Sequence, residues 1–261
     1  MNDPKTNNPK MNNPKINNKV YIHEFIDIIG HNRVNYMHHM TANWSPIAQE
    51  ERHQLCFGVW AVIGTTRGWP QVVNLWEEDG FTGLSRSLDL ECNNPSVQDP
   101  KLAKWWAEAA NYRSGGEDRV LVPAPWTRTI EQLCADGVRG DTYAHEQFRL
   151  PQGTSASFLD AVRDEAVGAF AKFGWELAGA LETALVNESE CFLLWSLPTF
   201  AQCGEVEAAQ RSDAGLARWR QRTYDLSTHQ HRFLLVDSPL SPMRTGRQPT
   251  RDDRHEGWED L

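Results

Sequence analysis

An internal repeat constrains the fold of this chain more than any other feature of its sequence. Four pairs of short segments match in the same order: YIHE at 21–24 with YAHE at 143–146, VVNLW ending at Trp76 with CFLLW ending at Trp195, LAKW at 102–105 with LARW at 216–219, and RVLVPAPWT from Arg119 with RFLLVDSPLS from Arg232. The offset between partners falls steadily along the chain, as small differences in loop length require. Four collinear matches indicate two copies of one unit.

Each copy predicts the same order of elements, β-α-β-β-α-β. In the first copy we expect strands at 20–28, 57–63, 72–76 and 120–126, a helix from 31 to about 43 that restarts at Ser45-Pro46, and a helix ending near Trp105 and Trp106. In the second copy we expect strands at 143–150, 177–186, 191–195 and 233–236, with helices at 155–173 and 216–224. Alternating apolar residues indicate the strands, and apolar residues at helical spacing indicate the helices.

This order is that of the ferredoxin-like unit, whose antiparallel sheet carries helices on one face only. The other face needs a cover, and two units in one chain can supply it to each other. The sequence therefore predicts an α+β fold of two tandem ferredoxin-like units packed sheet to sheet as a single-chain α+β barrel. The predicted boundaries are a disordered Asn/Pro/Lys tail at 1–19, units at 20–141 and 142–243, and a flexible C-terminal tail at 244–261.

Composition excludes several classes of protein. The net charge is −9, and no dense basic run lies within the acidic body, so we expect no nucleic acid partner. No apolar run approaches the length that crosses a bilayer, and the N-terminus lacks the apolar region of a secretory signal. Five cysteines without CxxC spacing fit a reducing compartment. A cytoplasmic protein without a membrane partner is expected.

The motifs resemble those of NIPSNAP-like members of the dimeric α+β barrel superfamily. VYIHEFIDI is similar to their opening strand, VVNLWEEDGFTGL to the strand that closes on Leu-Trp and enters a helix through an acidic residue, and RVLVPAPWT to their Pro-rich last strand. The chain departs from the family at Glu24 and Glu146, where an Arg is common. The resemblance implies the fold, and a superfamily that includes cofactor-free monooxygenases, isomerases, dehalogenases and haem enzymes.

Alternation along the strands places the polar motif residues on two faces. In the first strand of each copy, one face is apolar and is expected to pack under the helices. The opposite face should line the barrel cavity with Tyr21, His23, Phe25 and Asp27 from one copy and Tyr143, His145, Gln147 and Arg149 from the other. Glu24 and Glu146 then lie on the helix side, where a buried carboxylate needs a partner.

We interpret the cavity as the site of an enzyme that acts on a small hydrophobic or aromatic molecule. A His of near-neutral pKa beside a Tyr hydroxyl can move a proton, as in an isomerase, a lyase or a cofactor-free monooxygenase. The predicted catalytic residues are His23, His145, Tyr21 and Tyr143. The predicted substrate-binding residues are Phe25, Trp60, Trp76, Gln147, Arg149 and Trp195.

Other readings stay open. The chain could hold haem through a His axial ligand, or it could be a non-catalytic binding or assembly module, and homo-oligomerisation is also left open. We expect no metal ion, because His38 and His39 are adjacent on a helix and His229 and His231 lack a third ligand. Signatures of nucleotide binding and of the common hydrolases are absent, so no nucleotide cofactor is expected.

Overall fold

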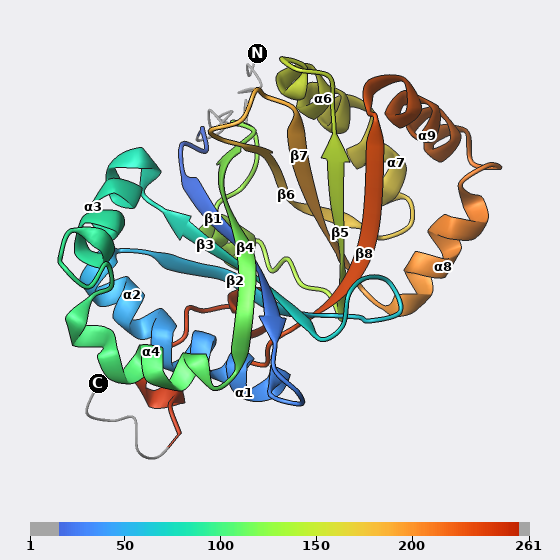
Figure 1. The fold of residues 1–261 in the computed structure, drawn as a ribbon. Coiled ribbons are helices and arrows are strands. Elements are labelled where there is room, and N and C mark those ends of the chain that lie inside the picture. The colour runs from blue at the N-terminus through green and yellow to red at the C-terminus, as the bar shows by residue number, and fades with distance from the viewer. Residues whose placement is uncertain (1–15, 256–261) are drawn as a thin grey trace, which may run out of the picture.

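The computed structural model describes residues 16–255, in which eight strands close into one antiparallel barrel (Figure 1). The strand order around the barrel is β1-β3-β2-β8-β5-β7-β6-β4. The strands are β1 (Val20–Ile28), β2 (Leu55–Val62), β3 (Gln71–Glu78), β4 (Arg113–Pro123), β5 (Thr142–Arg149), β6 (Glu176–Thr183), β7 (Glu190–Leu197) and β8 (His229–Asp237). Most of the predicted N-terminal tail and the end of the C-terminal tail lie outside the described residues.

The barrel consists of two halves with the same strand order, β4-β1-β3-β2 and β8-β5-β7-β6. Two short ladders join the halves, β2 with β8 and β4 with β6, each through three residue pairs. Both β2 and β6 carry a register shift near their starts, at Cys56/Gly58 and Leu177/Gly179. The predicted fold, two ferredoxin-like units packed as an α+β barrel, is confirmed.

Helices cover the outside of each half, on opposite sides of the barrel (Figure 1). The first half carries α1 (Arg33–His38), a π-helical segment η1 (His39–Trp44), α2 (Ser45–Arg52), α3 (Gly80–Cys92), the 3-10 segment η2 (Pro100–Leu102) and α4 (Ala103–Ala110). The second half carries α6 (Ser155–Ala161), the π-helical segment η3 (Val162–Ala166), α7 (Val167–Ala171), α8 (Phe200–Ala209) and α9 (Ala214–Leu226). No described helix is both long and apolar enough to cross a membrane.

Two details of the predicted elements are corrected. Ser45-Pro46 does not cap a new helix, because the π-helical segment η1 continues the helix through Trp44 into α2 without a break. The last strand of the first half begins at Arg113, well before Val120, since β4 pairs with β1 as far as Ile28.

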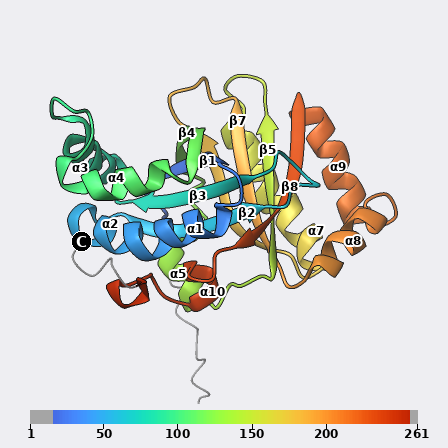
Figure 2. The same cartoon turned by 60° about the horizontal axis from the view of Figure 1, so that its bottom comes forward.

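Apolar side chains fill the interior of the barrel. This core is aromatic and branched, with Phe25, Phe57, Val73, Tyr143, Phe192 and Phe233 among its members. One end of the barrel is closed by α5 (Ile130–Ala135), in the connection between the halves, and by α10 (Pro242–Thr245) (Figure 2). Ile130, Leu133 and Met243 from these two helices belong to the same core. The interior expected to hold a ligand is thus largely occupied by the protein itself.

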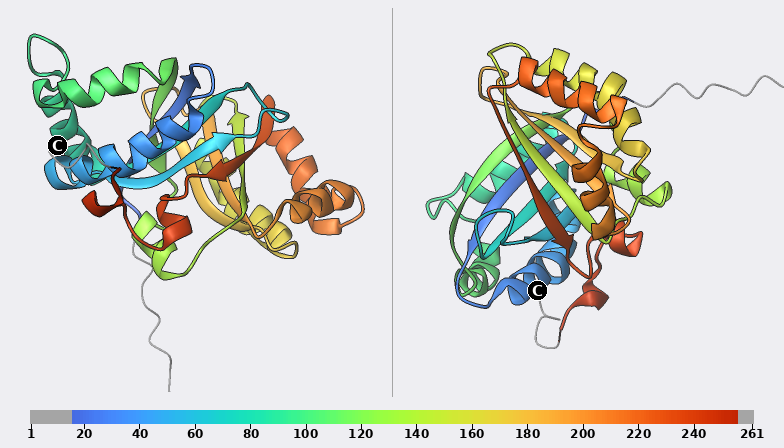
Figure 3. Two further views of the ribbon diagram at one scale, coloured as in Figure 1. Left: turned by 90° about the horizontal axis from the view of Figure 1, so that it is seen from below. Right: turned by 90° about the vertical axis from the view of Figure 1, so that its right-hand side faces the viewer.

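The segment after α10 packs against the first half (Figure 3). The side-chain amide of Gln248 donates to the carbonyl oxygen of Cys56 at 2.8 Å, and its oxygen accepts the Cys56 N–H at 2.9 Å. Arg251 forms an ion pair with Glu50 at 2.6 Å. These contacts fix the segment, including the 3-10 turn η4 (Arg251–Asp253), whereas the sequence predicted a flexible tail.

Candidate functional site

The structure brings the two repeated histidines together inside the barrel. The Nε2 atoms of His23 and His145 are 2.9 Å apart, so one ring donates a hydrogen bond to the other. Both side chains are buried, among the rings of Phe25, Phe192 and Phe233. Burial, followed by the charges of Arg119 and Arg67, lowers the pKa of His23 to about 3, and burial lowers the pKa of His145 well below its usual value. Both rings are therefore neutral near pH 7.

The repeated tyrosines lie nearer the closed end of the barrel and bond to carboxylates instead of to the histidines. Tyr21 donates to Glu77 at 3.0 Å, and Tyr143 donates to Asp237 at 3.3 Å. Burial is the largest cause of the raised pKa of both phenols. Neither tyrosine hydroxyl is hydrogen-bonded to a histidine within residues 16–255, and the catalytic role of the two tyrosines stays a prediction.

The remaining predicted residues separate between the two faces of the sheet. Phe25 and Trp60 lie in the barrel core, Gln147 donates to Glu190 at 2.9 Å, and Arg149 is exposed. Trp76 and Trp195 lie outside the barrel, in the cores under the helices. This corrects their predicted place in the barrel cavity: Trp76 is opposite Ile22 and Trp195 is opposite Ala144, both on the helix side.

None of the three described cavities is lined by His23 or His145. Their catalytic role therefore stays a prediction. Haem with a His axial ligand stays an alternative, although these two histidines do not border an open site for it. No histidine lines the largest described cavity, and the two barrel histidines contact each other within a packed aromatic core.

The largest described cavity, about 870 Å³, lies on the other side of the first-half sheet, between that sheet and α2, α3 and α4. Its size suits a small organic molecule. Four indoles line it, and two of its five carboxylates lie at facing positions of neighbouring strands. These residues are Trp44, Trp76, Trp105, Trp106, Glu24 and Asp118.

Glu24 is held on the cavity wall by two donors. Its Oε2 atom accepts hydrogen bonds from Trp76 Nε1 and from the Asn74 amide, each at 2.8 Å. The Asn74 amide also donates to the hydroxyl of Tyr36 at 2.8 Å, so the carboxylate is tied to both β3 and α1. These bonds fix one oxygen and leave Oε1 without a hydrogen bond among the described residues. The expectation that Glu24 lies on the helix side and needs a partner is met.

Asp118 lies directly across from Glu24, because the two residues form a cross-strand pair between β1 and β4. Cross-strand neighbours on one face are separated by only about 5 Å between Cβ atoms, and like charges there repel. Desolvation, then the charge of Glu24, raises the pKa of Asp118 to about 6, against the opposing charges of Arg113 and Arg119. A carboxyl group with this pKa can both lose and regain a proton near neutral pH.

The second half supplies another wall of the cavity. β4 pairs with β6 only through residues 121–123, and the Val120 carbonyl accepts the Ala184 N–H, so the edge of β4 before Val120 stays open toward the loop between β6 and β7. Arg119 bridges this opening with an ion pair of 2.9 Å to Glu190. Leu185, in the β6–β7 loop, is 90% exposed and makes the rim of the cavity apolar.

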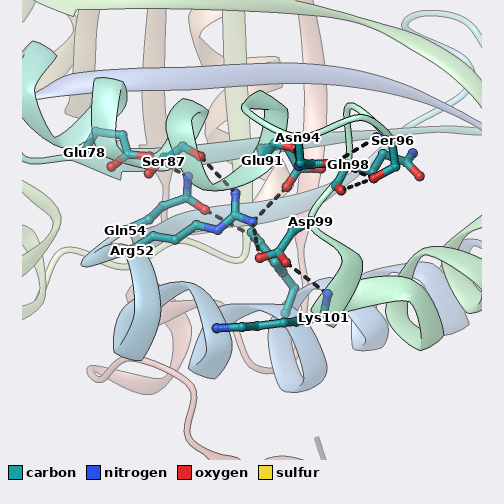
Figure 4. Close-up of polar contacts among 11 residues, drawn as sticks. Arg52, Gln54, Glu78, Ser87, Glu91, Asn94, Ser96, Gln98, Asp99 and Lys101 are labelled. Carbon is teal, nitrogen blue, oxygen red and sulfur yellow. Dashed lines mark hydrogen bonds and ion pairs between the residues drawn. The ribbon is translucent and has the colours of Figure 1, made fainter.

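A polar network holds the helices at the far end of the cavity (Figure 4). Arg52, at the end of α2, forms an ion pair of 2.8 Å with Glu91 of α3 and lies 3.6 Å from Asp99. The amide of Gln54 donates to Glu78 at 2.7 Å, and Ser87 donates to the same carboxylate oxygen at 2.8 Å. These bonds tie α2, α3 and the sheet together while leaving the space between them open.

Sequence comparison missed Asp118 because it aligned the last strands one residue out of register. The motif match pairs Arg119 with Arg232, both followed by apolar residues. In the structure, Glu24 faces Asp118 and Glu146 faces Arg232, so Asp118 is the counterpart of Arg232. A shift of one residue moves a strand side chain to the opposite face. The alternation of inward and outward side chains along β4, compared with that along β1, is the signal that could have revealed the Glu24–Asp118 pair.

No protein-family model matches the sequence, and a search of curated proteins gives no significant match. Solved structures match at the level of fold. A candidate monooxygenase from Lactobacillus acidophilus is 10% identical, with a TM-score of 0.53, over 90% of this chain and 97% of its own. An anthrone oxidase-like protein is 8% identical, with a TM-score of 0.53, over 84% and 91%. A NIPSNAP family protein from Agrobacterium tumefaciens is 19% identical, with a TM-score of 0.36, over 41% and 96%. The whole chain is thus similar in fold to α+β barrel proteins.

Proposed function

We propose that this protein is an enzyme that acts on a small hydrophobic or aromatic molecule bound in the first-half cavity. The observation that carries this proposal is the Glu24–Asp118 pair on the wall of a cavity of about 870 Å³ lined by four tryptophans. Apolar walls with a few convergent polar groups are typical of small-molecule sites, and a titratable group with a shifted pKa is typical of catalytic ones.

The proposed chemistry is proton transfer between the carboxylate pair and the substrate. Asp118 is mostly ionised at pH 7 and accepts a proton, while Glu24 stays fixed by Trp76 and Asn74. The indole walls orient the molecule beside the carboxylates. Isomerases, lyases and cofactor-free monooxygenases all use such a proton transfer, and the matched candidate monooxygenases and the anthrone oxidase-like protein share the fold that would carry it.

Hydrogen–deuterium exchange tests this proposal without knowledge of the full reaction. A panel of small aromatic and terpenoid-like compounds is incubated with the protein in heavy water, and exchange at carbon is followed by NMR. We expect exchange with the wild type and a loss of about 100-fold or more with Asp118→Asn. Val120→Trp, at a half-buried cavity position beside Asp118, should block exchange by filling the space.

The double variant His23→Leu/His145→Leu is the matched control for the barrel. Exchange should survive in it, because both histidines lie on the other face of the sheet from Asp118. Loss of exchange in this folded double variant together with full exchange in Asp118→Asn would place the chemistry at the histidine pair instead.

A further inference from the structure

We infer that the molecule bound in the first-half cavity carries a cationic nitrogen, which lies between the carboxylates of Glu24 and Asp118. This inference rests on the proposed function, because it names the class of molecule for the same cavity. It predicts an ammonium or iminium group attached to an apolar or aromatic body.

The first argument is a charge balance of the cavity. Three of its other carboxylates already have an arginine partner: Glu91 pairs with Arg52 at 2.8 Å, while Glu190 and Glu117 both pair with Arg119, at 2.9 and 2.8 Å. Within residues 16–255, neither Glu24 nor Asp118 forms an ion pair. Two carboxylates on facing strand positions without a cation are an unfavourable arrangement, which a bound cation would relieve.

The cavity arginines do not provide this cation. Arg52 and Arg119 are engaged by the carboxylates named above, and Arg149 is exposed at the rim. The guanidinium of Arg113 lies over the ring of Trp106, 5.0 Å from its centroid, and 5.8 Å from that of Trp105. Its charge offsets part of the repulsion at Asp118, but the pair stays negative.

The second argument comes from the second half, where the position that matches Asp118 holds a cation. There Glu146 is held by Trp195 at 2.7 Å, as Glu24 is held by Trp76, and the residue across from it is Arg232. The guanidinium of Arg232 contacts Glu146 at 2.7 Å and lies about 5 Å from the centroids of Phe170 and Trp175. The protein's own cation completes this site between a carboxylate and aromatic rings.

In the first half, both the cation and one of its aromatic partners are replaced. Asp118 stands where the second half has Arg232, and Gln54 stands before β2 where Trp175 stands before β6. Both Asp118 and Gln54 line the first-half cavity, together with the four indoles. A cation held by a carboxylate against an indole face gains both ionic and cation–π stabilisation.

Two probes of one shape test the inference. Benzyltrimethylammonium carries a quaternary nitrogen, and neopentylbenzene has a carbon atom in its place. Affinities for the wild type are measured by quenching of tryptophan fluorescence. We expect the ammonium to bind about tenfold or more tightly than the hydrocarbon, and Asp118→Asn to remove most of that difference while leaving the hydrocarbon unchanged. Asp118→Arg, which copies the second half, should abolish ammonium binding.

Glu117→Gln is the matched control. It removes another carboxylate of the same cavity, at the neighbouring position of β4, which already has Arg119 as its partner and pairs with Phe25 across the strands. Binding of the ammonium to Glu117→Gln should equal that of the wild type. An equal loss in Glu117→Gln and Asp118→Asn would mean that only the overall charge matters, which overturns the placement between Glu24 and Asp118.

The failure of this inference can be told from the failure of the proposed function. In one outcome the wild type binds both probes with equal affinity, and Val120→Trp binds neither. The cavity would then bind apolar molecules without preference for a cation. The proposed function would stand, and the inference of a cationic ligand would be overturned. If neither probe binds, or if Val120→Trp binds both as well as the wild type does, the cavity is not the site and both fail.

Discussion

The two halves of the barrel share a framework and differ in what they enclose. In each half a glutamate of the first strand accepts a hydrogen bond from a tryptophan of the third, Glu24 from Trp76 and Glu146 from Trp195. In the second half Arg232 neutralises the glutamate and borders a smaller cavity of about 510 Å³. In the first half a second carboxylate faces a cavity of about 870 Å³. In one half the glutamate has a cationic partner from the protein itself, and in the other we propose that a ligand supplies it.

The largest expected effect breaks the completed half. Arg232→Met removes the partner of Glu146, which is 0% exposed, so a buried carboxylate is left without a counter-ion. We expect a loss of about 3–5 kcal/mol in the free energy of unfolding, measured by urea denaturation. Asp118→Asn, at the matching position, should cost less than about 1 kcal/mol, since it removes a repulsion. Similar costs for the two variants would contradict the difference drawn between the halves.

The histidine pair that joins the halves should make the protein sensitive to acid. The pKa of both rings is lowered in the folded protein, so the unfolded chain binds protons first, and stability is lost as pH falls below about 6.5. Together, the two histidines should lower the free energy of unfolding at pH 5.5 by about 3 kcal/mol relative to pH 7.5. His23→Leu/His145→Leu should lose this part of the pH dependence in urea titrations. An unchanged pH profile in the double variant would show that the rings do not stay neutral.

The two indole donors should differ in their contribution to stability. Trp195→Phe leaves the buried Glu146 one donor short and should cost about 1–3 kcal/mol. Trp76→Phe should cost less, because Glu24 keeps its bond from Asn74 and borders the cavity. Thermal and urea denaturation of the two variants side by side measure this difference. A greater loss from Trp76→Phe would mean that the first-half framework is the more tightly packed one.

The smallest effect is the titration of Asp118, because this side chain is exposed and water screens its interactions. Its pKa is raised to about 6 in the folded protein, above the unfolded value, so its ionisation disfavours the fold and stability falls as pH rises from about 4 to about 6. Glu24, Glu117, Arg113 and Arg119 act on it. Subtracting the pH profile of Asp118→Asn from that of the wild type should isolate a downward slope in this range. A flat or rising difference would show that the pair is not coupled.

The sequence predicted much of the fold because repetition and alternation are properties of the chain itself. The paired motifs at 21–24 and 143–146 indicated two units, and the alternation of β1 and β5 placed His23 and His145 on the inner face, where the structure has them in contact. The barrel cavity that the sequence predicted is not among the described cavities, for a physical reason. Aromatic side chains from all around the sheet fill the interior, and α5 and α10, which the sequence analysis did not predict, close one end.

By itself, then, the sequence determined the duplicated unit, the strand faces and the acidic, tryptophan-rich character of the chain, because these follow from local periodicity and composition. Tertiary structure alone decided which strand positions face each other. The pairing of Glu24 with Asp118, and of Glu146 with Arg232, depends on a register between strands almost 100 residues apart in the chain, and one step of register reverses every side chain. The candidate site arises from that register.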